Sequence, residues 1–125
     1  MNLTNEHIKQ IIPFTAPFFV EMALFNMASE YSETYNGGQW TVAETNGVLH
    51  FVAPEGEYTV VNGDNYYEGT MDHVQYGRAL TVLLYNRFLW NIANEGAEVV
   101  QAASDRFYDI RDALVTDCEV SRFLD

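Results

Sequence analysis

The chain has 125 residues, 48% of them hydrophobic, which predicts one domain able to bury a core without metal or disulfide staples. Its formal net charge of −12 excludes the usual direct binder of DNA, since such proteins need cations to displace the counterions of the phosphate backbone. The acidic balance leaves two interpretations: a surface that keeps the protein soluble, or a surface complementary to a basic, nucleic-acid-binding partner.

The first third of the chain is expected to be helical. A short helix is predicted over residues 5–12, where Pro13 stops it, and a longer one over residues 17–34. Pro17 suits the first turn of the longer helix, because its missing N–H would have no partner there. The inward face of this helix is expected to carry positions that recur at helical spacing, namely Phe18, Met22, Phe25 and Ser29.

Short strands separated by turn residues occupy the middle of the chain. Asn46-Gly47 is the strongest hairpin signal in the sequence, because both residues tolerate positive φ. The alternating and β-branched stretches predict four short strands, over 39–44, 48–53, 58–61 and 66–68. With short loops between them, these strands are expected to form one small antiparallel meander of three or four strands.

The last third is expected to be helical again. Thr70 is predicted to cap a helix that runs to about residue 94 and stops at Gly96. Further helices are predicted over 97–115 and 118–124. The first of these two has an apolar stripe at spacings of four, four, three and four, formed by Val99, Ala103, Phe107, Ile110 and Leu114.

Helices before and after a small meander predict one α+β domain over residues 1–125, in which about four helices pack on one face of the sheet. The lone Cys118 cannot form an internal disulfide, so nothing argues for an oxidising compartment. The apolar stretch over 11–29 is interrupted by two prolines and Glu21, and it fits neither a membrane span nor a signal peptide. We therefore expect a soluble protein.

The sequence contains no catalytic or metal-binding constellation. His7, His50 and His73 have no second ligand at metal-site spacing, and His50 in mid-strand is predicted to be a partly buried structural histidine. There is no nucleophile elbow and no phosphate-binding loop. Carboxylate pairs such as Glu55 and Glu57 are expected by chance among so many acidic residues. The sequence therefore predicts a protein that is not an enzyme, with no cofactor and no bound metal.

Two groups of side chains are candidates for contact with a partner. In the 97–115 helix, four carboxylates lie at helical spacing opposite the apolar stripe, at Glu98, Asp105, Asp109 and Asp112. They form either an ordinary solvated helix face or an acidic strip that faces a basic partner. Tyr66 and Tyr67 precede the long helix, and tyrosine is enriched at interfaces. Packing in the core or on the sheet is the alternative for these two tyrosines.

Several motifs, in order, resemble those of the ArdB/KlcA antirestriction proteins. The central signature of that family is similar to the residues Tyr35, Gly37, Gly38, Trp40, Asn46, Gly47 and Pro54. The stretch 65–71, which includes Gly69, resembles the family's entry into its long helix, and residues 83–90 and 108–112 resemble later helical turns. Each motif is weak by itself, but together they follow the family's order over one short domain.

The resemblance covers residues 14–125, and residues 1–13 are expected to be a loosely matched N-terminal extension. It implies a protein carried on plasmids, phages and other mobile elements that relieves type I restriction in the bacterial cytoplasm, without catalytic residues. The expected partner is a type I restriction-modification complex or an accessory protein of it, bound by a monomer that contacts neither nucleic acid nor membrane. The alternative is an acidic interaction or DNA-mimic module that acts on another basic, nucleic-acid-binding partner.

Overall fold

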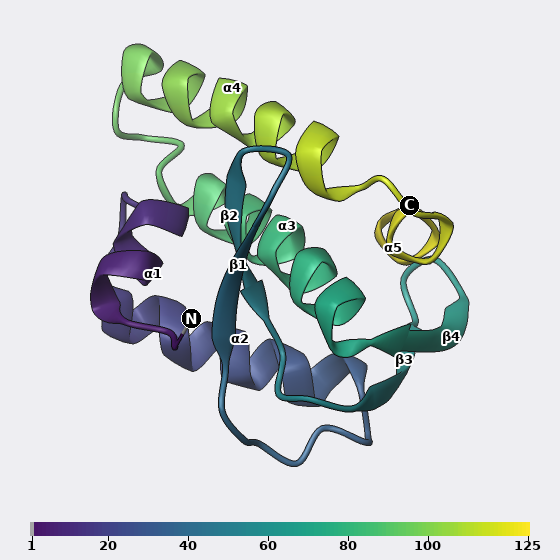
Figure 1. The fold of residues 1–125 in the computed structure, drawn as a ribbon. Helices are drawn as coiled ribbons and strands as arrows, with labels where there is room; N and C mark the ends of the chain where they lie inside the picture. The colour runs from purple at the N-terminus through teal and green to yellow at the C-terminus, as the bar shows by residue number, and fades with distance from the viewer. Residues whose placement is uncertain (1) are drawn as a thin grey trace.

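The computed structural model describes residues 2–125, so Met1 lies outside the described part of the chain. Over these residues the chain forms five helices and four strands (Figure 1). In chain order they are α1 (Asn5–Ile11), α2 (Pro17–Tyr31), β1 (Thr41–Thr45), β2 (Val48–Val52), β3 (Glu57–Asn62), β4 (Tyr67–Asp72), α3 (His73–Asn91), α4 (Ala97–Leu114) and α5 (Cys118–Leu124). The predicted α+β class is confirmed, and each predicted element is present with its ends shifted by a few residues.

The four strands form two separate antiparallel hairpins and not the single meander that we predicted. One hairpin pairs β1 with β2, and the other pairs β3 with β4. The ladder breaks after β2 because the Ala53 N–H donates to the His73 carbonyl at the start of α3, at 3.2 Å. Pro54 follows, and it has no N–H to offer to a neighbouring strand.

Helix α3 lies at the centre of the molecule and contacts both hairpins as well as α2, α4 and α5. Its largest fully buried side chains are Tyr76 and Tyr85. Their hydroxyls donate to the carbonyls of Ala28 in α2 and Ala103 in α4, at 2.7 and 3.0 Å. The other elements therefore pack around α3, and the predicted arrangement of helices on one face of a sheet is wrong because no single sheet exists.

The start of α3 differs from the prediction, because the expected cap, Thr70, is a strand residue that pairs with Thr59. Asp72 caps the helix instead. Its side chain accepts from the Gln75 N–H at 2.8 Å, and the Gln75 side chain accepts from the Asp72 N–H at 2.9 Å. This reciprocal arrangement satisfies two backbone N–H groups and places a negative charge at the positive end of the helix dipole.

The buried face of α2 also differs from the prediction. Val20, Leu24 and Met27 face the core, whereas Phe18 is 68% exposed and Met22 is exposed as well. Apolar residues lie on nearly every side of this helix, so their spacing cannot select the face that packs.

A membrane-spanning helix needs a long, uninterrupted apolar stretch, and no helix within residues 2–125 has one.

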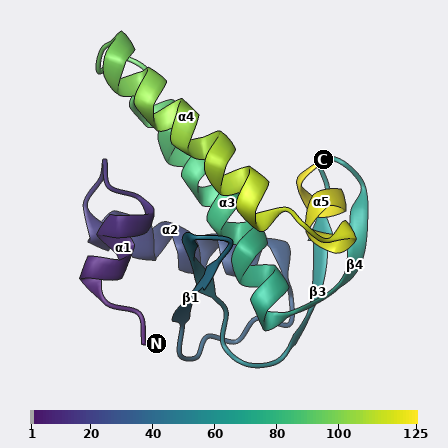
Figure 2. The same ribbon diagram turned by 45° about the horizontal axis from the view of Figure 1, so that its top comes forward.

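The apolar stripe of α4 packs inward along most of its length, as predicted. Ala103, Ile110 and Leu114 are buried, and Phe107 is partly buried against the core. Val99 is exposed and does not belong to the packed face. Figure 2 shows the reason: the first turns of α4 and the end of α3 project beyond the other elements.

The N-terminal segment is part of the packed structure. Ile8, Ile11 and Ile12 are buried in the core, and the Leu3 N–H donates to the Trp40 carbonyl at 3.4 Å. The stretch that the family motifs do not cover thus contributes three core side chains to the domain.

The turn between β1 and β2 has the predicted conformation. Asn46 and Gly47 both have positive φ, 51° and 83°, as a two-residue hairpin turn of this type requires. The Asn46 side-chain amide also donates to the Ala113 carbonyl of α4, at 2.9 Å. The turn therefore sets both the hairpin and its contact with α4.

Replacement of Gly47 by valine is expected to lower the free energy of unfolding by about 1 kcal/mol or more, because a β-branched residue is strained at this φ. Urea unfolding of the purified protein measures the change. Gly47→Asn is the matched control, and it should lose less stability because asparagine tolerates positive φ. Equal losses in the two variants would contradict this account of the turn.

Candidate functional site

Four residues of the family signature build a packed corner where the loop after α2 meets the end of β2, namely Tyr35, Gly38, Trp40 and Pro54. The Trp40 indole N–H donates to the Tyr35 hydroxyl at 3.1 Å, and the Tyr58 hydroxyl donates to the Pro54 carbonyl at 2.6 Å. Gly38 has φ 122°, and a Cβ at this position would lie 2.8 Å from Pro54 Cβ. These four residues thus have a structural role: the contact with Pro54 excludes a side chain at Gly38, and the hydrogen bonds hold the rings of Tyr35, Trp40 and Tyr58 in place.

Gly69 is confined by a second packed contact, between β4 and α5. The Tyr67 hydroxyl donates to Glu119 Oε2 at 2.5 Å, and the Tyr67 ring meets the Phe123 ring edge-on. A Cβ at Gly69 would collide with the Tyr67 hydroxyl oxygen. Burial, followed by the bond to Glu119 and its charge, raises the pKa of Tyr67 far above its ordinary value. Tyr67 therefore stays a neutral donor that joins β4 to α5.

Only one of the two tyrosines predicted to bind a partner is accessible. Tyr67 is 4% exposed and belongs to the core, whereas Tyr66 is 95% exposed. Tyr66 has φ 59°, so the chain turns just before β4 and sends the two side chains to opposite environments. The structure therefore removes Tyr67 from the candidate surface and leaves Tyr66 available there.

The four carboxylates predicted on α4 lie together on its solvent side. Glu98, Asp105, Asp109 and Asp112, here called the acidic strip, are all exposed. Within residues 2–125, none of them forms an ion pair. Gln101 fills the space between the first two and donates to Asp105 at 2.8 Å. The strip thus presents several uncompensated negative charges in one row.

Within residues 2–125, neither arginine of α4 forms an ion pair with the acidic strip. Arg106 donates to the Gln10 carbonyl at 3.1 Å and so ties α4 to α1. Arg111 pairs with Asp125 at 2.6 Å. The charge of Arg111 is therefore compensated by Asp125, whereas Arg106 keeps its charge and offsets part of the field of Asp109, three residues on. The field of the strip stays net negative toward solvent and toward a cationic ligand.

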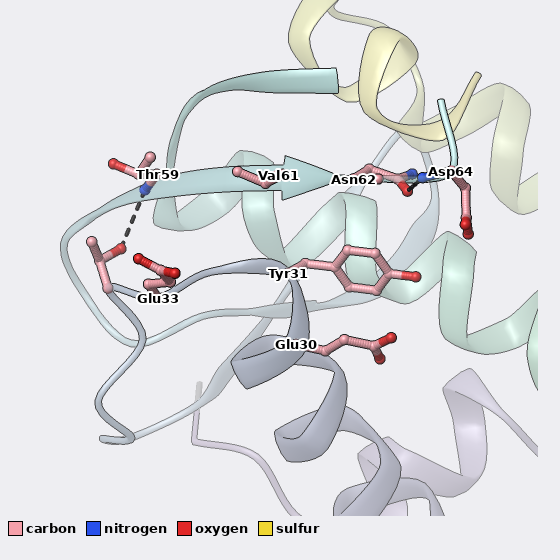
Figure 3. A pocket seen from close by; sticks show the side chains of 9 residues that line it. Glu30, Tyr31, Glu33, Thr59, Val61, Asn62 and Asp64 are labelled. Carbon is pink, nitrogen blue, oxygen red and sulfur yellow. Dashed lines mark hydrogen bonds between the residues drawn. The ribbon is translucent and has the colours of Figure 1, made fainter. Parts of the chain in front are cut away.

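A second acidic region, absent from the sequence-based prediction, lies in a hollow of about 530 Å³ between the end of α2 and β3 (Figure 3). Glu30 and Glu33 come from α2 and the residues after it, and Asp64 comes from the turn after β3. Glu30 is 4.0 Å from Arg87 and is partly compensated. Only folding brings these carboxylates together, so sequence offered no more than the spacing of Glu30 and Glu33 as a signal.

The hollow is lined by carboxylates and by hydroxyl and amide groups that can form hydrogen bonds. Burial, followed by the nearby Glu30 charge, raises the pKa of Tyr31 in its wall above the ordinary value. Across residues 2–125 there is no group of three His, Cys, Asp or Glu side chains placed to hold a metal ion. Like the acidic strip, the hollow can attract a cationic partner.

His50, singled out as the one histidine in mid-strand, is fully buried and hydrogen-bonded. Its Nδ1 lies 2.8 Å from the Phe51 carbonyl, and its Nε2 lies 2.8 Å from the Thr45 hydroxyl. Because a carbonyl only accepts, Nδ1 carries the proton and Nε2 accepts from Thr45. Burial lowers the pKa of His50 below 6.5, and the charge of Arg78 acts in the same direction, against the bond to Phe51.

The lowered pKa of His50 predicts a loss of stability in acid. Below pH 6.5 the unfolded histidine takes up a proton that the folded one resists, so the free energy of unfolding falls as pH decreases. The slope from this single group is at most about 1.4 kcal/mol per pH unit. Denaturant unfolding at pH 7.5 and 5.5 measures the fall. The variant His50→Gln should show a smaller fall, and an equal fall would contradict the prediction.

Comparison with known proteins gives two informative similarities, although no protein-family model matches the chain. A protein of Escherichia coli (strain K12) named "Putative antirestriction protein YubI" is 27% identical over 96 residues. The match spans 76% of this chain and 65% of that protein, so the chain covers less than two thirds of its relative's length.

A solved structure of the KlcA and ArdB proteins is also similar. The two folds superpose with a TM-score of 0.75 at 18% sequence identity, and the match covers 96% of this chain and 87% of the other. Those proteins are described as having a novel fold and antirestriction activity against type I DNA restriction systems in vivo but not in vitro. The present chain thus has the fold of the KlcA and ArdB proteins, as the resemblance of its motifs implied, and its sequence is similar to that of a protein named for antirestriction.

Proposed function

We propose that the chain relieves type I restriction of incoming DNA in a bacterial host by non-catalytic contact with a protein partner. The observation that carries the proposal is the match of fold to KlcA and ArdB over nearly the whole chain. The similarity to YubI, a protein named for antirestriction, adds independent support from sequence.

The form of the contact follows from the surface of the molecule. The acidic strip and the hollow beside α2 repel a nucleic acid backbone and attract a basic protein. The activity of KlcA and ArdB in vivo but not in vitro favours a partner that the cell supplies. We therefore propose that a monomer acts in the cytoplasm on the type I restriction-modification complex or on an accessory protein of it.

The unpaired charges of the acidic strip favour one second candidate, in which the strip imitates DNA phosphates and occupies the DNA site of a basic, nucleic-acid-binding protein. This alternative predicts direct competition. Purified protein should then inhibit DNA cleavage by a purified type I enzyme, whereas contact that depends on another cellular component predicts no inhibition in that assay.

Transformation by unmodified plasmid DNA tests the proposed function. A plasmid with several type I recognition sites is introduced into a restricting strain with and without the expressed chain. Expression is expected to raise the number of transformants by an order of magnitude or more. The same plasmid, already methylated by the host system, is the control and should transform both strains equally. Equal transformation by unmodified DNA would contradict the proposal, provided the chain is shown to be folded and abundant.

A further inference from the structure

An apolar groove of about 320 Å³ lies between α3 and α4. Its lining residues belong to the part of the chain where these two helices project from the molecule, as the ribbon in Figure 2 shows for the helices. Its apolar lining consists of Leu89, Trp90, Ala93, Val100, Phe107 and Tyr108. Two polar residues, Asn86 and Ser104, complete the wall. The groove therefore combines a concave shape with a mainly apolar surface, the form that accepts one face of an amphipathic helix.

The two largest side chains of this groove are open to solvent. Trp90 is 74% exposed and Tyr108 is 62% exposed. An exposed indole leaves a large apolar surface in contact with water, and a partner that covers it removes this unfavourable contact. Tryptophan and tyrosine are also the residues that contribute most to binding energy at protein interfaces. The pair thus marks the groove as a surface suited to a covering partner.

The acidic strip runs beside this groove on the same helix. Tyr108 lies three residues after Asp105 and four before Asp112, so helical geometry makes these carboxylates its neighbours. Arg111 lies on the same helix, and it forms an ion pair with Asp125 at 2.6 Å. A partner seated in the groove would therefore meet an apolar floor with a row of negative charges along one edge.

We infer that the groove and the acidic strip together bind an amphipathic helical segment of a partner protein, one that carries apolar residues on one face and Lys or Arg along the adjoining edge. The apolar face covers Trp90 and Tyr108, and the basic edge pairs with Asp105, Asp109 and Asp112. This inference deepens the proposed function and rests on it for the cellular identity of the partner. The groove supplies most of the affinity, whereas the strip sets orientation and excludes acidic segments.

The probe is a synthetic helical peptide of leucine and lysine of about 18 residues, which matches α4 in length. It contains no aromatic residue. The chain has two tryptophans, of which Trp40 is 4% exposed, so a change in accessibility on binding reports mainly on Trp90. The emission of Trp90 is expected to shift to shorter wavelength and to lose access to acrylamide as the peptide binds saturably. Titration calorimetry measures the affinity independently of fluorescence.

Matched variants separate the groove from general attraction between opposite charges. Trp90→Ala is expected to weaken peptide binding about tenfold or more, while Phe18→Ala, which removes an exposed aromatic ring from α2, should leave it unchanged. The triple change Asp105→Asn, Asp109→Asn and Asp112→Asn should weaken binding severalfold and reduce its dependence on salt. The control triple removes three exposed carboxylates elsewhere, namely Glu55→Gln, Glu57→Gln and Glu68→Gln.

Several outcomes would overturn the inference. They are an absence of saturable binding, equal binding of polylysine or of a leucine-glutamate peptide, and equal weakening by the control variants. A concentration-dependent dimer that Trp90→Ala abolishes, seen by sedimentation, would also overturn it by assigning the groove to a second copy of the chain. Protection from restriction with no peptide binding would refute the groove alone. Peptide binding without protection would refute the proposed function alone.

Discussion

The variant Gly77→Ala is expected to lose about 3 kcal/mol or more of its free energy of unfolding, and to fail to fold if the native protein is only marginally stable. Gly77 lies in α3 where this helix crosses β2. A Cβ there would overlap the Phe51 carbonyl oxygen and lie 2.7 Å from Val52 Cα. Both are backbone atoms, so the strand itself would have to move.

The direction of the change in the free energy of unfolding makes this variant a strict test of the contact between α3 and β2. Alanine is a better helix former than glycine by about 1 kcal/mol, so the same change on an open helix face would stabilise the protein. Here Thr81 also bridges the two elements, because its hydroxyl donates to the Gly77 carbonyl at 2.7 Å and accepts from the Phe51 N–H at 3.0 Å. Denaturant unfolding measures the change, with Gly63→Ala, a position in open space, as control. Stability at or above that of the parent protein would contradict the packing.

The second large effect is expected in the cell. The triple variant Asp105→Asn, Asp109→Asn and Asp112→Asn should lose most of its protection against restriction while it remains folded. Its free energy of unfolding should stay equal or rise by a few tenths of a kcal/mol, because Asp105 and Asp109 repel each other at a spacing of four residues. Transformation efficiency measures protection, and circular dichroism with urea unfolding measures the fold.

The matched control for this loss is the triple variant Glu55→Gln, Glu57→Gln and Glu68→Gln, which changes net charge by the same amount at exposed positions of the β3–β4 region. It should keep its protection. If both triple variants protect as well as the parent chain, the acidic strip has no role in the contact. If both fail equally, net charge matters and position does not.

Those features of the fold that depend on residues close together in the sequence could be predicted from the sequence. The Asn46-Gly47 turn is an example, because its backbone angles are set by the two residues themselves. The stripe of α4 is another, because charged residues on the opposite side leave only one face apolar enough to pack. The acidic strip could be predicted from the sequence for the same reason.

The features that the sequence did not reveal depend on distant contacts. The face of α2 is chosen by the core around Leu24 and Met27, and the hydrophobic pattern of the helix allowed several faces. Tyr66 and Tyr67 look alike in sequence, and they are separated by the positive φ of Tyr66 and by the contacts of Tyr67 with Glu119 and Phe123. The hollow beside α2 joins Glu30 to Asp64 across elements that local patterns cannot bring together, and the α3–α4 groove likewise forms only when two helices pair.

We propose that this chain protects incoming DNA from type I restriction by a non-catalytic contact, and the decisive experiment is the efficiency of plating of unmodified phage. Phage would be titred on a restricting strain with an empty vector or with the expressed chain, and on a non-restricting strain as reference. Expression of the chain is expected to raise the titre by several orders of magnitude toward the reference, with host methylation unaffected. A titre that stays at the level of the empty vector, with the chain folded and abundant in the same cells, would contradict it.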